Sequence, residues 1–309
     1  MALASEIPGL GSGVAPDALQ PVDCGLCGAK ERRLRFTEGP FSVVTCARCG
    51  LTYVTPRLRD ASLIAQVYDE SYWRSGAPKD RGYGDYRRDA PLYLATYRRR
   101  MKVVRRHFAR PGRVLDVGCA AGYFLSVMRD EGWRVTGLEP SDAIRPQAEE
   151  RLGRDAVHAG LLGQVALEPG SFDLVTMWDV IEHIPDVVGA AREVRRLLAP
   201  GGKFLIETQD VNSLAARVLG RRWQHYKHAE HIYHFNARTL ADALSRAGFR
   251  VLENRPWLGG KYVSLGFIAE RAGKLHPVFS VALAPLRLFS RASVYVNLLD
   301  EMIVVAEPV

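Results

Sequence analysis

The sequence predicts an α/β fold in which a doubly wound, seven-stranded, Rossmann-like sheet carries a smaller N-terminal module. An apolar run at residues 114–117 ends in a turn of small residues, and residues 123–129 continue with helical character. Two more apolar runs, at 133–139 and 172–178, have the length and composition of buried strands. Strands that alternate with helical segments indicate a mainly parallel sheet with helices on both faces.

The composition suits one large α/β core and a small appendage. The chain has 309 residues, of which 47% are hydrophobic, and it contains no apolar run long enough to cross a membrane as a helix. Residues 1–21 are small and polar and have no positively charged start, so we expect a disordered lead-in rather than a signal peptide. The net charge of +8 permits an anionic partner, namely a nucleotide-linked substrate, nucleic acid or a membrane surface. A solvated, arginine-rich helix face is the simpler explanation of that charge.

Four of the five cysteines form two C-x-x-C-G pairs, Cys24 with Cys27 and Cys46 with Cys49. A two-residue gap lets both thiolates of a pair face one tetrahedral ion, and the following glycine permits a sharp turn. We therefore predict a zinc ribbon over residues 22–56 with one structural Zn²⁺, and free or redox thiols are the alternative. This cysteine usage does not resemble a disulfide framework and predicts a reducing, cytoplasmic location.

Two short strands are expected inside the ribbon, at residues 33–36 and 41–45, joined by a turn at Gly39 and Pro40. Residues 57–110 are predicted to form a helical linker or lid. Tyr83 and Tyr86 are its candidate contacts, and a position in a solvated loop is the simpler explanation for each. Apolar residues recur at helical spacing from 92 to 108 and predict a helix that leads into the core.

The turn after residue 117 is the centre of the predicted site. A dinucleotide site needs three glycines in this turn so that a pyrophosphate can approach, but only Gly118 and Gly122 are present. Asp116, at the end of the strand, would repel a pyrophosphate and suits a cofactor that carries an ammonium and a sulfonium. The alternative is a purely structural βα turn.

This turn resembles motif I of the class I S-adenosylmethionine-dependent methyltransferases, which usually reads D-x-G-C-G-x-G. Ala120 stands where that family has its middle glycine. Glu139, at the end of the next strand, matches the acid that accepts the two ribose hydroxyls in the family. The resemblance implies a cofactor site built from ten residues: Asp116, Gly118, Cys119, Ala120, Gly122, Tyr123, Glu139, Pro140, Trp178 and Asp179.

Two further parts of the cofactor region depart from the family or leave alternatives open. Residues 159–162 contain no acid near the expected adenine, so we expect backbone and apolar contacts there. Asp179, Glu182 and His183 form a turn that binds a divalent ion in some relatives that methylate ring hydroxyls. In many other relatives the same turn holds no metal and positions a loop beside the methyl group.

Four histidines, at positions 225, 228, 231 and 234, recur at every third residue. On an α-helix this spacing would not place all four on one face. The segment resembles the E-H-x-x-x-F-(S/N) stretch that faces the acceptor pocket in related sugar-modifying methyltransferases, followed by a helix over residues 239–249. We predict His231 as the general base or acceptor anchor, with His228 second, and a histidine that only hydrogen-bonds the loop as the alternative.

The C-terminal part is predicted to complete the methyltransferase domain, residues 111–309. We expect a sixth strand at 249–253 and a last, antiparallel strand at 302–307 on the sheet edge. Two apolar helices, at 261–271 and 278–290, would form a helical cap inserted at about 257–298. This cap could roof the acceptor pocket, pair two subunits or touch a membrane surface, and either a monomer or a homodimer is compatible with it.

The resemblance to zinc-ribbon-bearing methyltransferases of type 23 covers the whole chain. It implies methyl transfer to a hydroxyl of a small molecule, with a sugar, glycan or secondary metabolite as acceptor. One alternative is RNA base methylation, but residues 178–179 do not continue into the (D/N)-P-P-(Y/F) motif, and the basic residues are not interleaved with aromatic ones. The other alternative is a module that binds S-adenosylmethionine without turnover.

Overall fold

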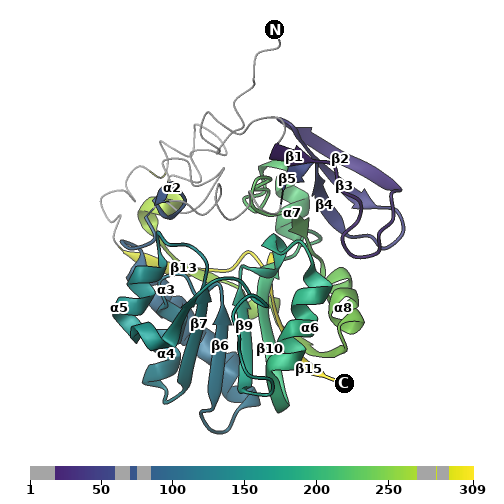
Figure 1. Ribbon diagram of the computed structural model, residues 1–309. Helices are drawn as coiled ribbons and strands as arrows, with labels where there is room; N and C mark the ends of the chain where they lie inside the picture. The colour runs from purple at the N-terminus through teal and green to yellow at the C-terminus, as the bar shows by residue number, and fades with distance from the viewer. Residues whose placement is uncertain (1–17, 60–69, 75–84, 270–282, 284–291) are drawn as a thin grey trace.

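The computed structural model describes residues 18–59, 70–74, 85–269, 283 and 292–309. Figure 1 shows a large sheet covered by helices and a smaller sheet, built from the N-terminal strands, beyond its upper edge. The large sheet has the strand order β12-β15-β10-β9-β6-β7-β8. The predicted seven-stranded, doubly wound fold is therefore confirmed.

Five neighbouring strands of the large sheet, β10, β9, β6, β7 and β8, run parallel, as the alternation of strands and helices predicts. Strand β15 is antiparallel to both of its neighbours, β10 and β12. The seven strands are β6 (Arg113–Val117), β7 (Arg134–Glu139), β8 (Val157–Ala159), β9 (Phe172–Trp178), β10 (Leu198–Gln209), β12 (Phe249–Asn254) and β15 (Glu301–Pro308).

The predicted position of the last strand is wrong. Strand β15 lies inside the sheet, between β10 and β12, and β12 forms the edge. The first six residues of β15 are buried without alternation, which is the pattern of a strand covered on both faces. Strand β12 has only one buried residue, Phe249, as an edge strand allows.

Helix α6 illustrates how an apolar stripe lets a helix cover the sheet. Helix α6 buries Val187, Ala191, Val194 and Leu197, and it packs beside α8. Helix α3 packs against α4 and, farther along, against β13. The longer helices are α3 (Ala90–His107), α4 (Tyr123–Asp130), α5 (Arg145–Leu152), α6 (Val187–Leu197) and α8 (Ala237–Arg246). Short helices complete the connections: α2 (Glu70–Trp73), η2 (Arg154–Ala156), η3 (Ile181–His183), α7 (Leu214–Leu219), η4 (Gly220–Arg222) and η5 (Pro256–Leu258).

The smaller sheet, which we call the ribbon sheet, has the order β11-β4-β3-β2. Its strands are β2 (Arg32–Glu38), β3 (Phe41–Cys46), β4 (Thr52–Thr55) and β11 (Tyr233–His234). The predicted hairpin is present as β2 and β3. Strand β11 was not predicted and comes from the distant histidine segment, so the ribbon is joined to the methyltransferase domain by backbone pairing.

Tyr233 is the centre of that junction. Its backbone pairs with Tyr53 of β4, and its hydroxyl donates to the carbonyl oxygen of Pro185 at 2.8 Å. Gly25 packs on the same ring so closely that any Cβ there would lie 1.8 Å from the Tyr233 hydroxyl. The ribbon and the loop after β9 therefore meet on one side chain.

Two other predictions need correction. Within the predicted disordered lead-in, β1 (Leu19–Gln20) pairs with β5 (Arg57–Leu58), while residues 1–17 lie outside the described residues. The predicted helix at 261–271 instead begins as a strand, because β13 (Lys261–Ser264) pairs with β14 (Ser293–Val296). The aromatic and β-branched residues of both segments suit a strand. Residues 265–269 are helical, and all but one residue of the predicted helix at 278–290 fall outside the described part of the chain.

None of the helices that the structure describes is both long enough and apolar enough to cross a membrane.

Candidate active site

A cavity of about 950 Å³ opens at the carboxyl ends of the parallel strands, which is where open α/β sheets bind their ligands. It is lined by the turn after β6 and by Glu139, and also by residues of α3, of the histidine segment and of the C-terminal insertion. The predicted cofactor region and the predicted acceptor region therefore share one cavity.

Asp116, the penultimate residue of β6, lines this cavity and is almost fully buried. The Thr176 hydroxyl of the neighbouring strand donates to Oδ1 of Asp116 at 2.6 Å. Burial raises the pKa of Asp116 to about 8. A cationic group in the cavity would favour the ionised form of this carboxyl.

Glu139 is the last residue of β7, and its carboxylate accepts hydrogen bonds from the turn after β6 and from the turn after β7. One carboxylate oxygen accepts from the backbone N–H of Ala120 at 2.9 Å, and the other accepts from the N–H of Ser141 at 2.8 Å. Burial raises the pKa of Glu139 to about 7 although these two N–H groups lower it. Each oxygen keeps a second lone pair, so the carboxylate can hold the turn and still accept hydroxyl hydrogens.

The turn itself needs backbone angles that favour glycine. Gly118 has φ +73°, Ala120 has φ +49° and Gly122 has φ +71°. A side chain on Gly118 would also meet Val180, because its Cβ would lie 2.7 Å from Cγ2 of Val180. Ala120 is thus the one member of the turn whose side chain opposes the conformation that the turn adopts.

We expect the substitution Ala120→Gly to stabilise the protein by about 0.5–1 kcal/mol, because glycine removes the strain of the left-handed backbone conformation. The higher conformational entropy of glycine in the unfolded chain offsets part of this stabilisation. Urea unfolding of the two proteins measures this difference. Ala121→Gly is the matched control, since Ala121 is buried without a positive φ, and it should lower the stability. Equal losses in both variants would contradict the argument.

Eight of the ten predicted cofactor residues line the cavity: Asp116, Gly118, Cys119, Ala120, Glu139, Pro140, Trp178 and Asp179. The other two lie behind the turn. Gly122 caps the N-terminus of α4 and packs on Leu152, and Tyr123 stacks with Tyr86 at 5.4 Å between ring centroids. Their role is to support the turn.

Leu161 and Leu162, which follow β8, also line the cavity. Trp73 also lines it, and its ring nitrogen donates to the Ser141 hydroxyl at 3.1 Å. Tyr86 is buried at the cavity, whereas Tyr83 lies outside the described residues.

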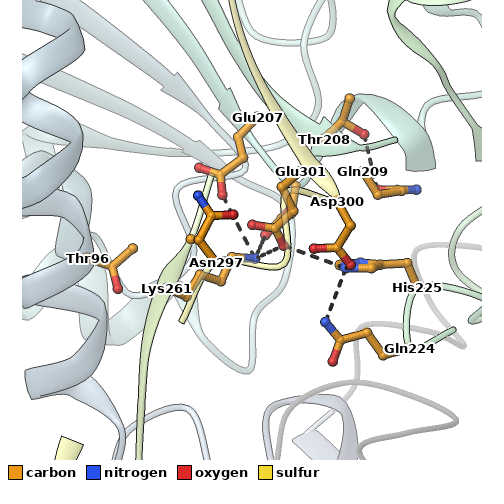
Figure 2. A network of polar contacts seen from close by, with 12 residues as sticks. Thr96, Glu207, Thr208, Gln209, Gln224, His225, Lys261, Asn297, Asp300 and Glu301 are labelled. Carbon is orange, nitrogen blue, oxygen red and sulfur yellow. Dashed lines mark hydrogen bonds and ion pairs between the residues drawn. The ribbon is translucent and has the colours of Figure 1, made fainter. Parts of the chain in front are cut away.

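A charged network that the sequence analysis missed also lines the cavity (Figure 2). The Lys261 ammonium lies 2.8 Å from the carboxylates of both Asp179 and Glu301, and 4.0 Å from Glu207. Arg100 of α3 donates to Glu207 at 2.7 Å. Burial alone would raise the pKa of Asp179, but the Lys261 ammonium lowers it below its ordinary value. A glutamate within the otherwise apolar run of β10 was the available sequence signal for this network.

The histidine segment is not helical; it consists of turns that lead into β11. The argument from helical spacing therefore does not apply, and His225 and His231 line the cavity together. His228 instead lies at the ribbon, where its Nε2 is 3.3 Å from the Glu38 carboxylate. The structure thus places the second predicted catalytic histidine against the ribbon hairpin.

His231 is held by its backbone surroundings. Its Nδ1 lies 2.9 Å from the carbonyl oxygen of His225, so this nitrogen donates and Nε2 carries the lone pair. Burial, with His183 nearby, keeps the pKa of His231 well below its ordinary value. His231 is accordingly a neutral imidazole with an acceptor nitrogen.

The turn after β9 brings Glu182 and His183 toward His231. The rings of His183 and His231 lie edge to face, 4.8 Å apart between centroids. One ligand atom from each of Glu182, His183 and His231 lies within 4.8 Å of the other two. Asp179, which the sequence hypothesis grouped with Glu182 and His183, instead groups with Glu207 and Glu301.

The four predicted zinc ligands meet in the ribbon. Sγ of Cys24 lies 3.5 Å from Sγ of Cys49, and Sγ of Cys27 lies 3.6 Å from Sγ of Cys46. A tetrahedral zinc ion, about 2.3 Å from each sulfur, places sulfurs about 3.8 Å apart. Gly28 and Gly50 turn the two knuckles with φ +69° and +82°. The geometry fits one tetrahedral metal ion.

Comparison with known proteins identifies the family of this chain. A family model described as a methyltransferase domain matches residues 86–254, more than half of the chain. The chain therefore belongs to this methyltransferase family, and its predicted membership of the S-adenosylmethionine-dependent class is confirmed.

Two curated relatives illustrate the match. A probable S-adenosylmethionine-dependent methyltransferase of Mycolicibacterium smegmatis is 33% identical over 50% of this chain and 59% of its own length. A ubiquinone biosynthesis O-methyltransferase of Sodalis glossinidius is 37% identical over 33% of this chain and 43% of its own length. The chain thus spans about half the length of these relatives.

Among solved structures, a complex of the Haloferax volcanii Trm112 methyltransferase activator and a putative methyltransferase contains a similar chain. The TM-score is 0.50 at 18% identity, and the match covers 77% of this chain and 96% of that one. At this identity the likeness concerns the fold alone.

Proposed function

We propose that this protein transfers the methyl group of S-adenosylmethionine to a hydroxyl of a small molecule. The observation that supports the proposal is the shared cavity, which is lined by Asp116 and Glu139 and also by His231, whose Nε2 carries a lone pair. The O-methyltransferase names among the curated relatives support a hydroxyl acceptor.

Each cofactor residue has a definite task in this proposal. S-adenosylmethionine supplies an electrophilic methyl group. Asp116 attracts the cationic methionine end, and Glu139 accepts hydrogen bonds from the ribose hydroxyls. Trp73 and the leucines at 161 and 162 exclude water around the adenine. Because the displacement at the methyl carbon is in line, most of the rate comes from holding both reactants in one dry cavity.

The acceptor side favours a polyhydroxyl compound, in agreement with the expected sugar, glycan or secondary metabolite. Lys261, Glu301 and His225 bring polar and charged groups to the cavity lining. Such groups can form hydrogen bonds with several hydroxyls of one acceptor.

We also propose that the four cysteines bind a structural Zn²⁺. All four positions are thiolates, which leaves no open coordination site for catalysis. The ion would therefore act on the fold of the ribbon sheet.

We expect His231→Ala to lower kcat by about 10²–10⁴-fold, because the variant lacks the general base that accepts the proton of the acceptor hydroxyl. The affinity for S-adenosylmethionine should stay unchanged, since His231 lies on the acceptor side. Steady-state kinetics and calorimetry separate these two quantities. His158→Ala is the matched control, because His158 lies on β8 and should leave both quantities as they are. Unchanged kcat in His231→Ala would remove this residue from the mechanism.

Binding of S-adenosylmethionine is expected to strengthen at least about tenfold between about pH 6 and about pH 8.5. Without ligand, the pKa of Asp116 is raised to about 8 and that of Glu139 to about 7, so both carboxyls are largely protonated at the lower pH. The cationic cofactor prefers the ionised forms, and binding near pH 7 should release protons. Calorimetry in two buffers of different ionisation enthalpy measures this release, and proton uptake would contradict the assignment.

The test of the function is methyl transfer from labelled S-adenosylmethionine to a panel of sugars, phenols, amines and RNA. Product formation with hydroxyl compounds is expected. Methylation of RNA or amines in their place, or cofactor binding without any turnover, would overturn the proposal.

A further inference from the structure

We propose that Glu182, His183 and His231 bind a divalent transition-metal ion at the acceptor end of the cavity. Glu182 and His183 come from η3, and His231 comes from the turns before β11. One ligand atom of each lies within 4.8 Å of the others. Two protein segments that are distant in sequence thus supply a carboxylate and two imidazoles to one point.

Both imidazoles have the tautomer that a metal requires. Nδ1 of His183 lies 2.8 Å from the carbonyl oxygen of Glu230, and Nδ1 of His231 lies 2.9 Å from that of His225. A carbonyl oxygen only accepts, so each Nδ1 carries the hydrogen and each Nε2 carries the lone pair. Metal-binding histidines are commonly oriented by this kind of backbone hydrogen bond.

The hydrogen bonding of the buried Glu182 carboxylate independently supports a cation at this position. Its side chain is fully buried, and the Thr208 hydroxyl donates to Oε2 at 2.9 Å. The other oxygen, Oε1, has no hydrogen-bond partner among the residues that the structure describes. A buried carboxylate oxygen without a partner is costly, and a cation beside it would offset that cost.

The donor set selects the class of metal. Two imidazole nitrogens and one carboxylate oxygen suit Zn²⁺, Fe²⁺, Co²⁺ or Ni²⁺ better than Mg²⁺ or Ca²⁺, which prefer oxygen ligands. Ligands about 2.1 Å from such an ion stand about 3–3.5 Å apart, so small side-chain rotations would close the set. Three protein ligands leave coordination positions for other groups, and both histidines line the cavity.

The neighbouring acidic group does not compete for the ion. Asp179, Glu207 and Glu301 also lie close together, but the Lys261 ammonium is 2.8 Å from two of them. This ammonium already supplies the positive charge at that position. The metal site that the geometry points to therefore uses His231 in place of Asp179.

The role of the ion rests on the proposed function, because a hydroxyl acceptor is what its open positions would hold. His231 would then act on the acceptor oxygen through the ion, as a ligand. Binding of the ion, in contrast, needs neither cofactor nor acceptor and can be measured without them.

The test is a Co²⁺ titration of the full chain with its ribbon loaded with zinc, followed by visible absorption and by metal analysis after dialysis. We expect the wild-type protein to retain one more Co²⁺ per chain than Glu182→Gln or His183→Asn, with the absorption of a nitrogen and oxygen site. Thiolate-to-cobalt absorption would report exchange in the ribbon separately. Glu150→Gln, an exposed glutamate, is the matched control and should behave like the wild type.

Equal Co²⁺ retention by the wild type and both variants would overturn the metal site. Calorimetry with S-adenosylmethionine verifies that each variant is folded. Methyl transfer to a hydroxyl by a protein that retains no additional Co²⁺ would reject the inference and leave the proposed function standing. Ion binding without any hydroxyl methylation would reject the proposed function and leave the site.

Discussion

Replacing Cys46 by alanine is expected to unfold the ribbon sheet and to reduce methyl transfer to background. A structural zinc ion contributes an apparent free energy of folding of about 10–16 kcal/mol in small zinc modules, so its loss is expected to outweigh the apolar packing of the ribbon. Strand β11 pairs with β4, so the loss of the ribbon should also release the segment that carries His231. Limited proteolysis, zinc analysis and activity measure the three effects.

S-adenosylmethionine affinity should survive this substitution, because Asp116 and Glu139 lie on the large sheet. Arg48→Ala is the matched control: Arg48 is exposed and lies between the cysteines of the same knuckle, and its replacement should leave the ribbon intact. Full methyl transfer by Cys46→Ala would show that the acceptor side folds without the metal.

Arg100→Met is expected to lower the free energy of unfolding by about 3–5 kcal/mol, the usual loss when one partner of a buried ion pair is removed. Arg100 is completely buried. It donates to both oxygens of Glu207 and to the carbonyl oxygens of Leu258 and Gly260. Without it, the cationic partner that remains to Glu207 among the described residues is the Lys261 ammonium at 4.0 Å. Urea unfolding measures the loss.

Arg98→Met is the control on the same helix, because Arg98 is exposed and should change stability by less than about 0.5 kcal/mol. The double variant Arg100→Met, Glu207→Met should regain part of the loss, since it leaves no unpaired buried charge. Two equal losses from Arg100→Met and Arg98→Met would show that the buried pair contributes nothing.

The parts of the site that sequence reasoning predicted are those with a local signal. The turn after β6, Glu139 and the two cysteine pairs each combine a fixed spacing with a fixed chemistry, so their neighbours along the chain determine their geometry. The hairpin of the ribbon was predicted for the same reason. In each case the backbone conformation follows from a few adjacent residues.

The parts that escaped prediction depend on contacts between distant segments. Strand β11 has only two residues, so it carries no periodic signal, and its pairing with β4 is a tertiary effect. The sequence ranks His231 first and His228 second, but it does not predict that His228 lies against Glu38 while His231 lines the cavity. Lys261 lay in a segment with helical composition, but pairing with β14 made it part of a strand.

The pairing of β11 with β4 also limits which segments can be exchanged between related proteins. The ribbon and the histidine segment form one structural unit whose two halves lie far apart in the chain, and Gly25 accommodates the ring of Tyr233 at their contact. A chimera that received residues 22–56 from one such protein and the histidine segment from another would hold all four cysteines, but its ribbon would pair with a β11 strand of different sequence. Acceptor preference should therefore be transferable only when both halves are inherited together.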